Sequence, residues 1–254
     1  MYLVIGERGD ASARWAAMGL ASRGLAPLRY LTADDLRDAR TWDHRIGVDG
    51  ASFRIELADG SEIASDRIVG CYNRLQVAPL PRVAASPGDA AYAQGELQAL
   101  LLSALQVIRA VLVNAPTPRG PAGPVLPSME WRRSAAAAGL ATIDLHESSR
   151  EPRESRDPPW FDGPIGAELD VVRVVVIDRM VIGRCPAEVK SGAPELARIL
   201  DCGVLGLTFG VRDGRWQLSS GTATPDLVQA GTAGLDALAG LLIRSTDRIA
   251  QAAS

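Results

Sequence analysis

The opening of the chain alternates short apolar runs with segments of helical periodicity. Tyr2–Ile5 has the pattern of a buried strand, Asp10 or Ser12 can cap a helix that ends near Gly24, and Leu28–Leu31 has the pattern of a second strand. A strand, a helix and another strand in this order are typical of a parallel sheet covered by helices. We therefore expect an α/β fold at this end of the protein.

Shorter alternating segments follow, and they predict a small antiparallel insertion. Three such segments, Arg45–Val48, Phe53–Leu57 and Glu62–Ala64, are separated by Asp-Gly turns. Arg67–Tyr72 then returns to the pattern of a buried strand. A long helix from Pro87 to about Arg109 comes next, because its leucines keep helical spacing.

Short helices, hairpins and polar loops are predicted for the second half. Helices are expected at Ser128–Ala138, where Ser128 would be the cap, at Pro194–Leu200, and from Pro225 to Ile249. The strands are expected at Val111–Asn114, Ala141–Leu145, Val171–Ile177, Met180–Arg184, Val204–Val211 and Trp216–Ser219. Residues 146–166 are polar and rich in proline, which favours a mobile loop. We divide the chain into residues 1–114, with the parallel sheet and the insertion, and residues 115–254, a smaller α+β half.

Composition excludes some partners. The formal charge of −3, with arginines spread along the chain, gives no electrostatic basis for binding nucleic acid. No apolar stretch approaches the roughly 20 residues of a membrane span, and no signal peptide is apparent. Three cysteines without metal-ligand spacing are typical of free thiols in a reducing compartment. We therefore expect a soluble, cytoplasmic protein.

Six stretches together carry a resemblance to a known family. They are Leu3–Asp10, Val69–Arg74, Val113–Pro116, Trp131–Leu140, Asp170–Val181 and Leu205–Gly210. In this order they resemble the ATP-grasp ligases, and within these the branch that ligates side chains of ribosomal peptides. The resemblance covers nearly the whole chain. It implies a pre-ATP-grasp domain over residues 1–114, a reduced ATP-grasp domain over residues 115–254, and ATP and Mg²⁺ as cofactors.

The departures from the family pattern concern charged residues. Lysine occurs once, at Lys190, whereas the family binds its nucleotide with two lysines, and an arginine fork does not simply replace a lysine point charge. Ser219 and Gly221 stand where the family has its magnesium-binding glutamate and asparagine, and Asp213 is a turn residue and a weak substitute. These departures favour a protein that uses neither ATP nor Mg²⁺.

Three cations are candidates for binding phosphate or a substrate carboxylate. Arg74 follows a buried strand, where open α/β sheets place their ligands, and its alternative is a solvated loop arginine. Arg173 lies on an apolar strand, either as a clamp or as an edge-strand residue facing water. Lys190 precedes Ser-Gly, which permits a phosphate role, but the segment lacks the context of a P-loop, and its alternative is a lysine in a surface loop. No residue is assigned a catalytic role.

Two classes of function remain open. The first is a degenerate, non-catalytic relative that binds a peptide or a partner protein. The second is an ATP-dependent carboxylate–amine or carboxylate–alcohol ligase that modifies a peptide, with Arg74 and Arg173 as anion ligands and Asp213 as a metal ligand. Either form could be a homodimer through the apolar helices at Leu97–Ile108 or Leu235–Ile249.

Overall fold

A four-stranded parallel sheet organises the first part of the protein. The computed structural model describes residues 1–48, 50–78, 87–142, 170–212 and 214–252. The strand order of this first sheet is β2-β1-β6-β7, comprising β1 (Tyr2–Gly6), β2 (Leu28–Thr32), β6 (Gly70–Asn73) and β7 (Leu112–Val113). The strands are short apolar runs because both faces of the sheet are covered. The expectation of a parallel sheet with helices is confirmed.

One face of the first sheet packs on a small antiparallel sheet and several helices. The antiparallel sheet has the order β3-β4-β5, with β3 (Thr41–Gly47), β4 (Gly50–Glu56) and β5 (Glu62–Ala64) followed by the 3₁₀ turn η1 (Ser65–Arg67). Helices α2 (Ala33–Arg37) and α3 (Pro87–Val107) and the turn η2 (Arg109–Val111) complete this layer. Its core includes Leu3, Ile5, Phe53, Leu101 and Leu105. The predicted antiparallel insertion is therefore present, with β3 and β4 longer than expected.

A second four-stranded sheet, wholly antiparallel, organises the rest of the chain. Its order is β11-β10-β8-β9, with β8 (Asp170–Ile177), β9 (Met180–Ile182), β10 (Val204–Arg212) and β11 (Arg215–Thr222). Helices α4 (Ser128–Ala137) and α5 (Ala187–Ile199) pack on one face, around Val174, Leu207 and Phe209. Both predicted hairpins, β8–β9 and β10–β11, are present.

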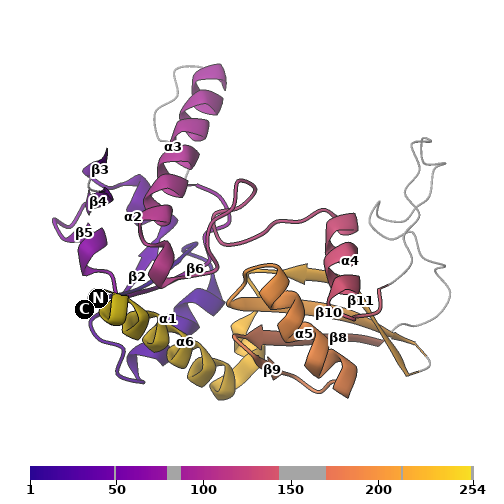
Figure 1. Cartoon of the computed structure of the whole chain (residues 1–254). Coiled ribbons are helices and arrows are strands. Elements are labelled where there is room, and N and C mark those ends of the chain that lie inside the picture. The colour runs from indigo at the N-terminus through magenta and orange to yellow at the C-terminus, as the bar shows by residue number, and fades with distance from the viewer. Residues whose placement is uncertain (49, 79–86, 143–169, 213, 253–254) are drawn as a thin grey trace.

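Helix α6 (Gly231–Ala252) joins the two larger sheets into one body. Together with α1 (Ala11–Ala21) and the 3₁₀ turn η3 (Leu227–Ala230), it covers the face of the first sheet that carries Val4 and Tyr72. The same cluster includes Val175, Ile177 and Val204 of the second sheet. In Figure 1, α6 runs beside α1, begins near β9 and ends close to the N-terminus of the chain. The last helix of the chain is therefore shared by both sheets.

Three element boundaries differ from the sequence-based expectation. Helix α5 begins at Ala187 and contains Pro194, because burial of Val189, Leu196 and their neighbours outweighs the cost of about 3 kcal/mol for an internal proline. Helix α6 begins at Gly231, after η3, and not at Pro225. Pro127, without a side-chain hydrogen bond, occupies the cap position of α4 that we assigned to Ser128.

Two expectations concern residues that are only partly described. Thr142 forms an isolated parallel bridge with Leu218, and residues 143–145 of the expected strand lie outside the described residues. The expected loop at 146–166 lies outside them as well. No helix in the described ranges is both long and apolar enough to cross a membrane.

Candidate functional site

The carboxyl ends of β1, β6 and β7 lie at one edge of the first sheet, which is where open α/β sheets bind ligands. Residues that follow these strands meet the segment that follows β11. Asn114, directly after β7, makes the first of these connections. Its Nδ2 donates to the carbonyl oxygens of Val204 at 2.7 Å and Ala223 at 2.8 Å, and its Oδ1 accepts from the amide of Val204 at 2.9 Å. This one side chain therefore connects the first sheet to the first residue of β10 and to the residue that follows β11.

Asn114 adopts a backbone conformation that suits few residue types. Its φ of +60° lies in the left-handed region, where asparagine is tolerated better than most residues. The side chain is 2% exposed, so its amide has little access to water. The conformation and the three hydrogen bonds together explain why the strand is followed by asparagine.

Arg74 makes a second connection at the same edge. Its Nε donates to Oδ2 of Asp10 at 2.7 Å, and its Nη1 donates to the Tyr72 hydroxyl at 3.1 Å and to the Pro225 carbonyl at 2.7 Å. The side chain is 6% exposed. Asp10 also caps α1 by accepting from the amide of Ala13. The guanidinium is thus neutralised by Asp10, and its donors are directed at groups of the chain itself.

Ser12 continues this set of contacts on the first turn of α1. Its hydroxyl donates to Oδ1 of Asp226 at 2.6 Å and accepts from the amide of Leu227 at 3.0 Å. The hydrogen bond from Ser12 is the main reason why the pKa of Asp226 lies below its ordinary value of 3.8. Asn73 adds a contact to a neighbouring loop by donating to the carbonyl of Pro121 at 2.8 Å. The residues at 223–227 are consequently held from several directions.

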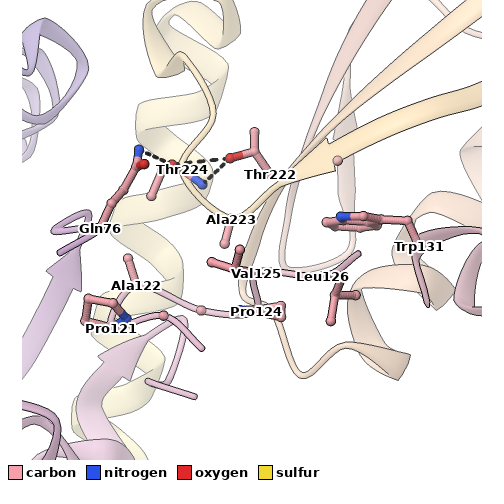
Figure 2. A pocket seen from close by; sticks show the side chains of 13 residues that line it. Gln76, Pro121, Ala122, Pro124, Val125, Leu126, Trp131, Thr222, Ala223 and Thr224 are labelled. Atoms are coloured by element: carbon pink, nitrogen blue, oxygen red, sulfur yellow. Dashed lines mark hydrogen bonds between the residues drawn. The ribbon is translucent and has the colours of Figure 1, made fainter. Parts of the chain in front are cut away.

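A pocket of about 200 Å³ opens beside these contacts. Figure 2 shows Trp131 on one side, Gln76 on the opposite side, and Thr222 and Thr224 above a base of proline and aliphatic residues. Its lining residues are Gln76, Gly120–Leu126, Trp131 and Gly221–Thr224, and none of them is charged. We call this cavity the Trp131 pocket.

Hydrogen bonds order the polar side of the Trp131 pocket. Nε2 of Gln76 donates to Oγ1 of Thr224 at 3.1 Å, and the amide of Thr224 donates to Oγ1 of Thr222 at 3.1 Å. The two threonine hydroxyls lie 3.3 Å apart. The opposite side is apolar, so a ligand meets amide and hydroxyl groups on one side and hydrocarbon on the other.

Trp131 occupies the space in front of Gly221. A Cβ atom placed on Gly221 would lie 2.5 Å from the six-membered ring of the indole, which is closer than atoms pack. Only glycine therefore allows the ring to lie here. Ser219, the other position compared above with the family's magnesium ligands, donates its hydroxyl to the carbonyl of Thr208 at 2.9 Å.

The cations that the sequence analysis singled out are not brought together. Arg74 is buried and paired with Asp10, so it is not a solvated loop residue. Arg173 is exposed on β8, where it pairs with Thr208 of β10 and lies beyond the residues of β8 that pair with β9. Lys190 is exposed on helix α5, where we had expected a loop. Asp213 lies outside the described residues.

The residues at the C-terminal end of β11, and just after it, do not fit a magnesium–nucleotide complex. The side chains from Leu218 to Thr224 are hydroxyls, aliphatic groups or hydrogen, whereas Mg²⁺ prefers one or two carboxylates. Across the described ranges of the chain, no three histidine, cysteine, aspartate or glutamate residues gather in a group that could hold a metal ion.

Sequence reasoning missed the Trp131 pocket. The signal available was the run of proline and glycine between Pro116 and Pro124, which by itself indicates only a loop. Nothing in the local sequence pairs Trp131 with Gly221, which lies 90 residues later. The stretch Val113–Pro116, by contrast, did draw attention to Asn114.

Comparison with solved structures identifies the fold. The chain is similar to the macrocyclase MdnB from Microcystis aeruginosa MRC, with 13% identity over 95% of this chain and 98% of that one and a TM-score of 0.67. It is similar to a Chryseobacterium gregarium RiPP-associated ATP-grasp ligase in complex with ADP and a leader and core peptide, with 11% identity, 96% of each chain and a TM-score of 0.71. It is also similar to the ATP-grasp ligase PsnB complexed with precursor peptide PsnA2 and AMPPNP, with 18% identity, 97% and 98% coverage and a TM-score of 0.67.

These comparisons establish an α/β fold of the ATP-grasp type, as found in peptide-modifying ligases. The resemblance stated from the sequence is therefore confirmed at the level of the fold. No protein-family model matches the sequence, and no curated protein matches it either. Fold does not determine function, which depends on the residues of the site.

Proposed function

We propose that this protein is a non-catalytic member of the ATP-grasp fold that binds a peptide or a partner protein. The observation that carries the proposal is that the residues at the C-terminal end of β11 carry no charge. Ser219 and Gly221 stand where the resemblance expects a glutamate and an asparagine. Gly221 is, moreover, covered by Trp131, so that a longer side chain has no room there. Phosphoryl transfer depends on positioning and on charge neutralisation, and these residues supply no charge.

The state of Arg74 supports the same proposal. A cation that is to bind phosphate or a substrate carboxylate needs free donors directed at the ligand. Nε and Nη1 of Arg74 are bonded to Asp10, Tyr72 and Pro225 at 3.1 Å or less. We therefore assign Arg74 a structural role, in which it fixes the end of β6 against α1 and the segment after β11.

The residues of this site are suited to binding a peptide. Solved structures with the same fold contain a precursor peptide, or a leader and core peptide. Here the Trp131 pocket offers an apolar wall, amide and hydroxyl groups and no charge. Such a pocket suits an uncharged segment of a polypeptide better than a nucleotide triphosphate.

The proposal is tested by titrating the purified protein with ATP in a calorimeter, with and without Mg²⁺, and by measuring phosphate release. We expect neither magnesium-dependent binding nor turnover. ATP turnover that disappears in an Asp213→Ala variant would overturn the proposal and favour the alternative, an ATP-dependent carboxylate–amine or carboxylate–alcohol ligase. Arg173→Ala is a matched variant, because in that alternative Arg173 would hold phosphate and its loss would raise KM for ATP.

A further inference from the structure

The outer edge of β3 pairs with no strand that the structure describes. The inner edge pairs with β4 along its whole length, from Thr41↔Glu56 to Gly47↔Gly50. Figure 1 shows this hairpin on the side of the molecule that faces away from the second sheet. An unpaired edge is a template for a further strand, so the groups that it presents decide which strand can join it.

The register with β4 fixes which backbone groups of β3 face outward. Residues along an antiparallel strand alternate between pairs that exchange backbone hydrogen bonds and pairs that do not. His44 stands opposite Phe53, and the amide of Phe53 bonds on the other side of β4, to the hydroxyl of Ser65 at 3.1 Å. His44 and Phe53 therefore exchange no backbone hydrogen bonds. Because the pattern has a period of two, Trp42, His44 and Ile46 direct their N–H and C=O groups outward, where no described residue bonds to them.

The side chains of β3 carry opposite charges two positions apart. Asp43 and Arg45 lie on one face of the strand, where they are 47% and 79% exposed and form an ion pair at 2.9 Å. On the other face, Ile46 is 75% exposed and Trp42 is half-buried. One face of the edge thus offers a carboxylate and a guanidinium, and the other offers an aliphatic and an aromatic side chain.

A second copy of the same strand complements this pattern. If two β3 strands run antiparallel about a two-fold axis at His44, then Trp42 of each copy faces Ile46 of the other. All three outward residues can then exchange backbone hydrogen bonds with their counterparts. Asp43 of each copy lies opposite Arg45 of the other. Opposite charges and aromatic–β-branched pairs directly across two strands are both stabilising.

Other registers of the same two strands are disfavoured. An axis at Asp43 sets the two aspartates against each other, and an axis at Arg45 does the same with the two arginines. Like charges directly opposite are destabilising. An axis at Trp42 or Ile46 leaves part of the outward backbone groups without partners. The charges of β3 therefore specify both the partner strand and its register.

The two helices that we considered for a dimer interface use their apolar positions mainly inside the protein. Leu235, Leu238 and Leu242 of α6 are buried against the two larger sheets. Leu101 and Leu105 of α3 are buried in the core between the first sheet and the small antiparallel sheet. A contact between copies is therefore better supported at β3 than at either helix.

We propose that two copies of this chain associate through their β3 strands, antiparallel and centred on His44, and that the Asp43–Arg45 contacts across the axis select this register. The small sheets of both copies then form one continuous sheet. An edge-to-edge contact buries little surface, so the association is weak and reversible. The inference goes beyond the proposed function, since β3 contributes nothing to the Trp131 pocket.

Charge reversal tests the register. Arg45→Asp gives each copy two aspartates on this face, and Asp43→Arg gives it two arginines, so that each variant repels its own kind. We expect the dissociation constant of the dimer to rise about tenfold or more in each variant, measured by sedimentation velocity of the full chain from micromolar to millimolar concentration. The variant with both changes restores opposite charges across the axis and the dimer. An equal mixture of the two single variants forms a mixed dimer, because one copy is negative and the other positive.

Two further variants separate the edge contact from general effects of charge and folding. Arg198→Asp is the matched control, because Arg198 is 72% exposed and paired with Glu195, as Arg45 is with Asp43, and we expect unchanged association. Ile46→Pro removes an outward N–H group that β4 does not use, a position at which an edge strand tolerates proline. We expect this variant to keep its circular dichroism spectrum and to remain monomeric.

Two results would overturn the inference. One is a wild-type protein that stays monomeric up to millimolar concentration. The other is a wild-type dimer that Arg45→Asp, Asp43→Arg and Ile46→Pro leave as tight as before, which would place the contact between copies on another surface.

Discussion

Nε of Arg74 lies 2.7 Å from Oδ2 of Asp10, and the two side chains are 6% and 16% exposed. This ion pair connects the end of β6 to the N-terminus of α1. Arg74 also donates to the Pro225 carbonyl, so the pair connects the first sheet to the segment that leads into α6. A buried charge is tolerated only with a partner, which makes each member depend on the other.

Removing the charge of Asp10 will destabilise the protein strongly. Asp10→Asn keeps an oxygen that can cap α1 but leaves Arg74 as a buried, unpaired cation. We expect a loss of about 3–5 kcal/mol in the free energy of unfolding, measured by urea denaturation. Asp236→Asn is the control, because Asp236 pairs with Arg23 while being 68% exposed, and we expect less than about 1 kcal/mol there. If the two variants lost equal amounts of free energy of unfolding, Arg74 would not depend on the charge of Asp10. Arg74 would then be free to serve another function.

Asn114 will tolerate neither alanine nor glycine. Asn114→Gly relieves the positive φ of 60° but removes the bonds to Val204 and Ala223. Because buried backbone groups are left without partners, we expect both variants to lose about 2–4 kcal/mol in the free energy of unfolding. Asp201→Gly is the matched control, with a φ of +51° and a side chain that, among the described residues, is bonded to exposed Arg109. If Asn114→Gly left the free energy of unfolding unchanged, the positive φ alone would explain why asparagine stands at this position.

A methyl group at Gly221 will displace Trp131. The added Cβ would lie 2.5 Å from the indole, so either the ring or β11 must shift. We expect Gly221→Ala to lower the free energy of unfolding by about 1–3 kcal/mol and to move the Trp131 indole cross-peak in a ¹H–¹⁵N correlation spectrum. Gly95→Ala is the control, since Gly95 lies in α3 and no atom of the described residues comes within 4 Å of its Cβ position. There we expect a gain of about 0.5–1 kcal/mol, because alanine favours a helix.

The hydrogen bond from Ser12 to Asp226 gives the protein a defined dependence on acid. Since the pKa of Asp226 is lowered in the folded state, its contribution to stability is present above the ordinary pKa of 3.8 and is lost as the pH falls through the lowered value. Ser12→Ala also removes the acceptor of the Leu227 amide, and we expect a loss of about 1–3 kcal/mol at pH 7. The difference between the wild type and Ser12→Ala should shrink below pH 4 in denaturation curves.

A smaller change at the same carboxylate is the control. Gln229→Ala removes the weaker bond to Asp226, at 3.1 Å, from an exposed residue, and we expect less than about 1 kcal/mol. A difference between wild type and Ser12→Ala that is constant from pH 7 to pH 2 would contradict the prediction. It would show that Ser12 acts through Leu227 alone.

The local sequence determined the elements whose signals are contained in a few neighbouring residues. The run Tyr2–Ile5 and the Asp-Gly turns at 59–60 and 213–214 were enough to predict strands and hairpins, because side-chain periodicity and turn chemistry act over short distances. The same information failed at Pro194. There, packing of α5 on the second sheet outweighs the preference of proline for a helix start.

The site, in contrast, was decided by tertiary structure. The sequence identified Arg74 as a residue at the end of a strand, but its partner Asp10 lies 64 positions earlier and Pro225 lies 151 positions later. The absence of carboxylates from Leu218 to Thr224 was visible in the sequence, whereas the ring of Trp131 over Gly221 was not. Composition fixes which charges a chain possesses. Only the folded structure decides which of them are neutralised and which uncharged surfaces are left to bind a ligand, because both depend on contacts between residues far apart in the chain.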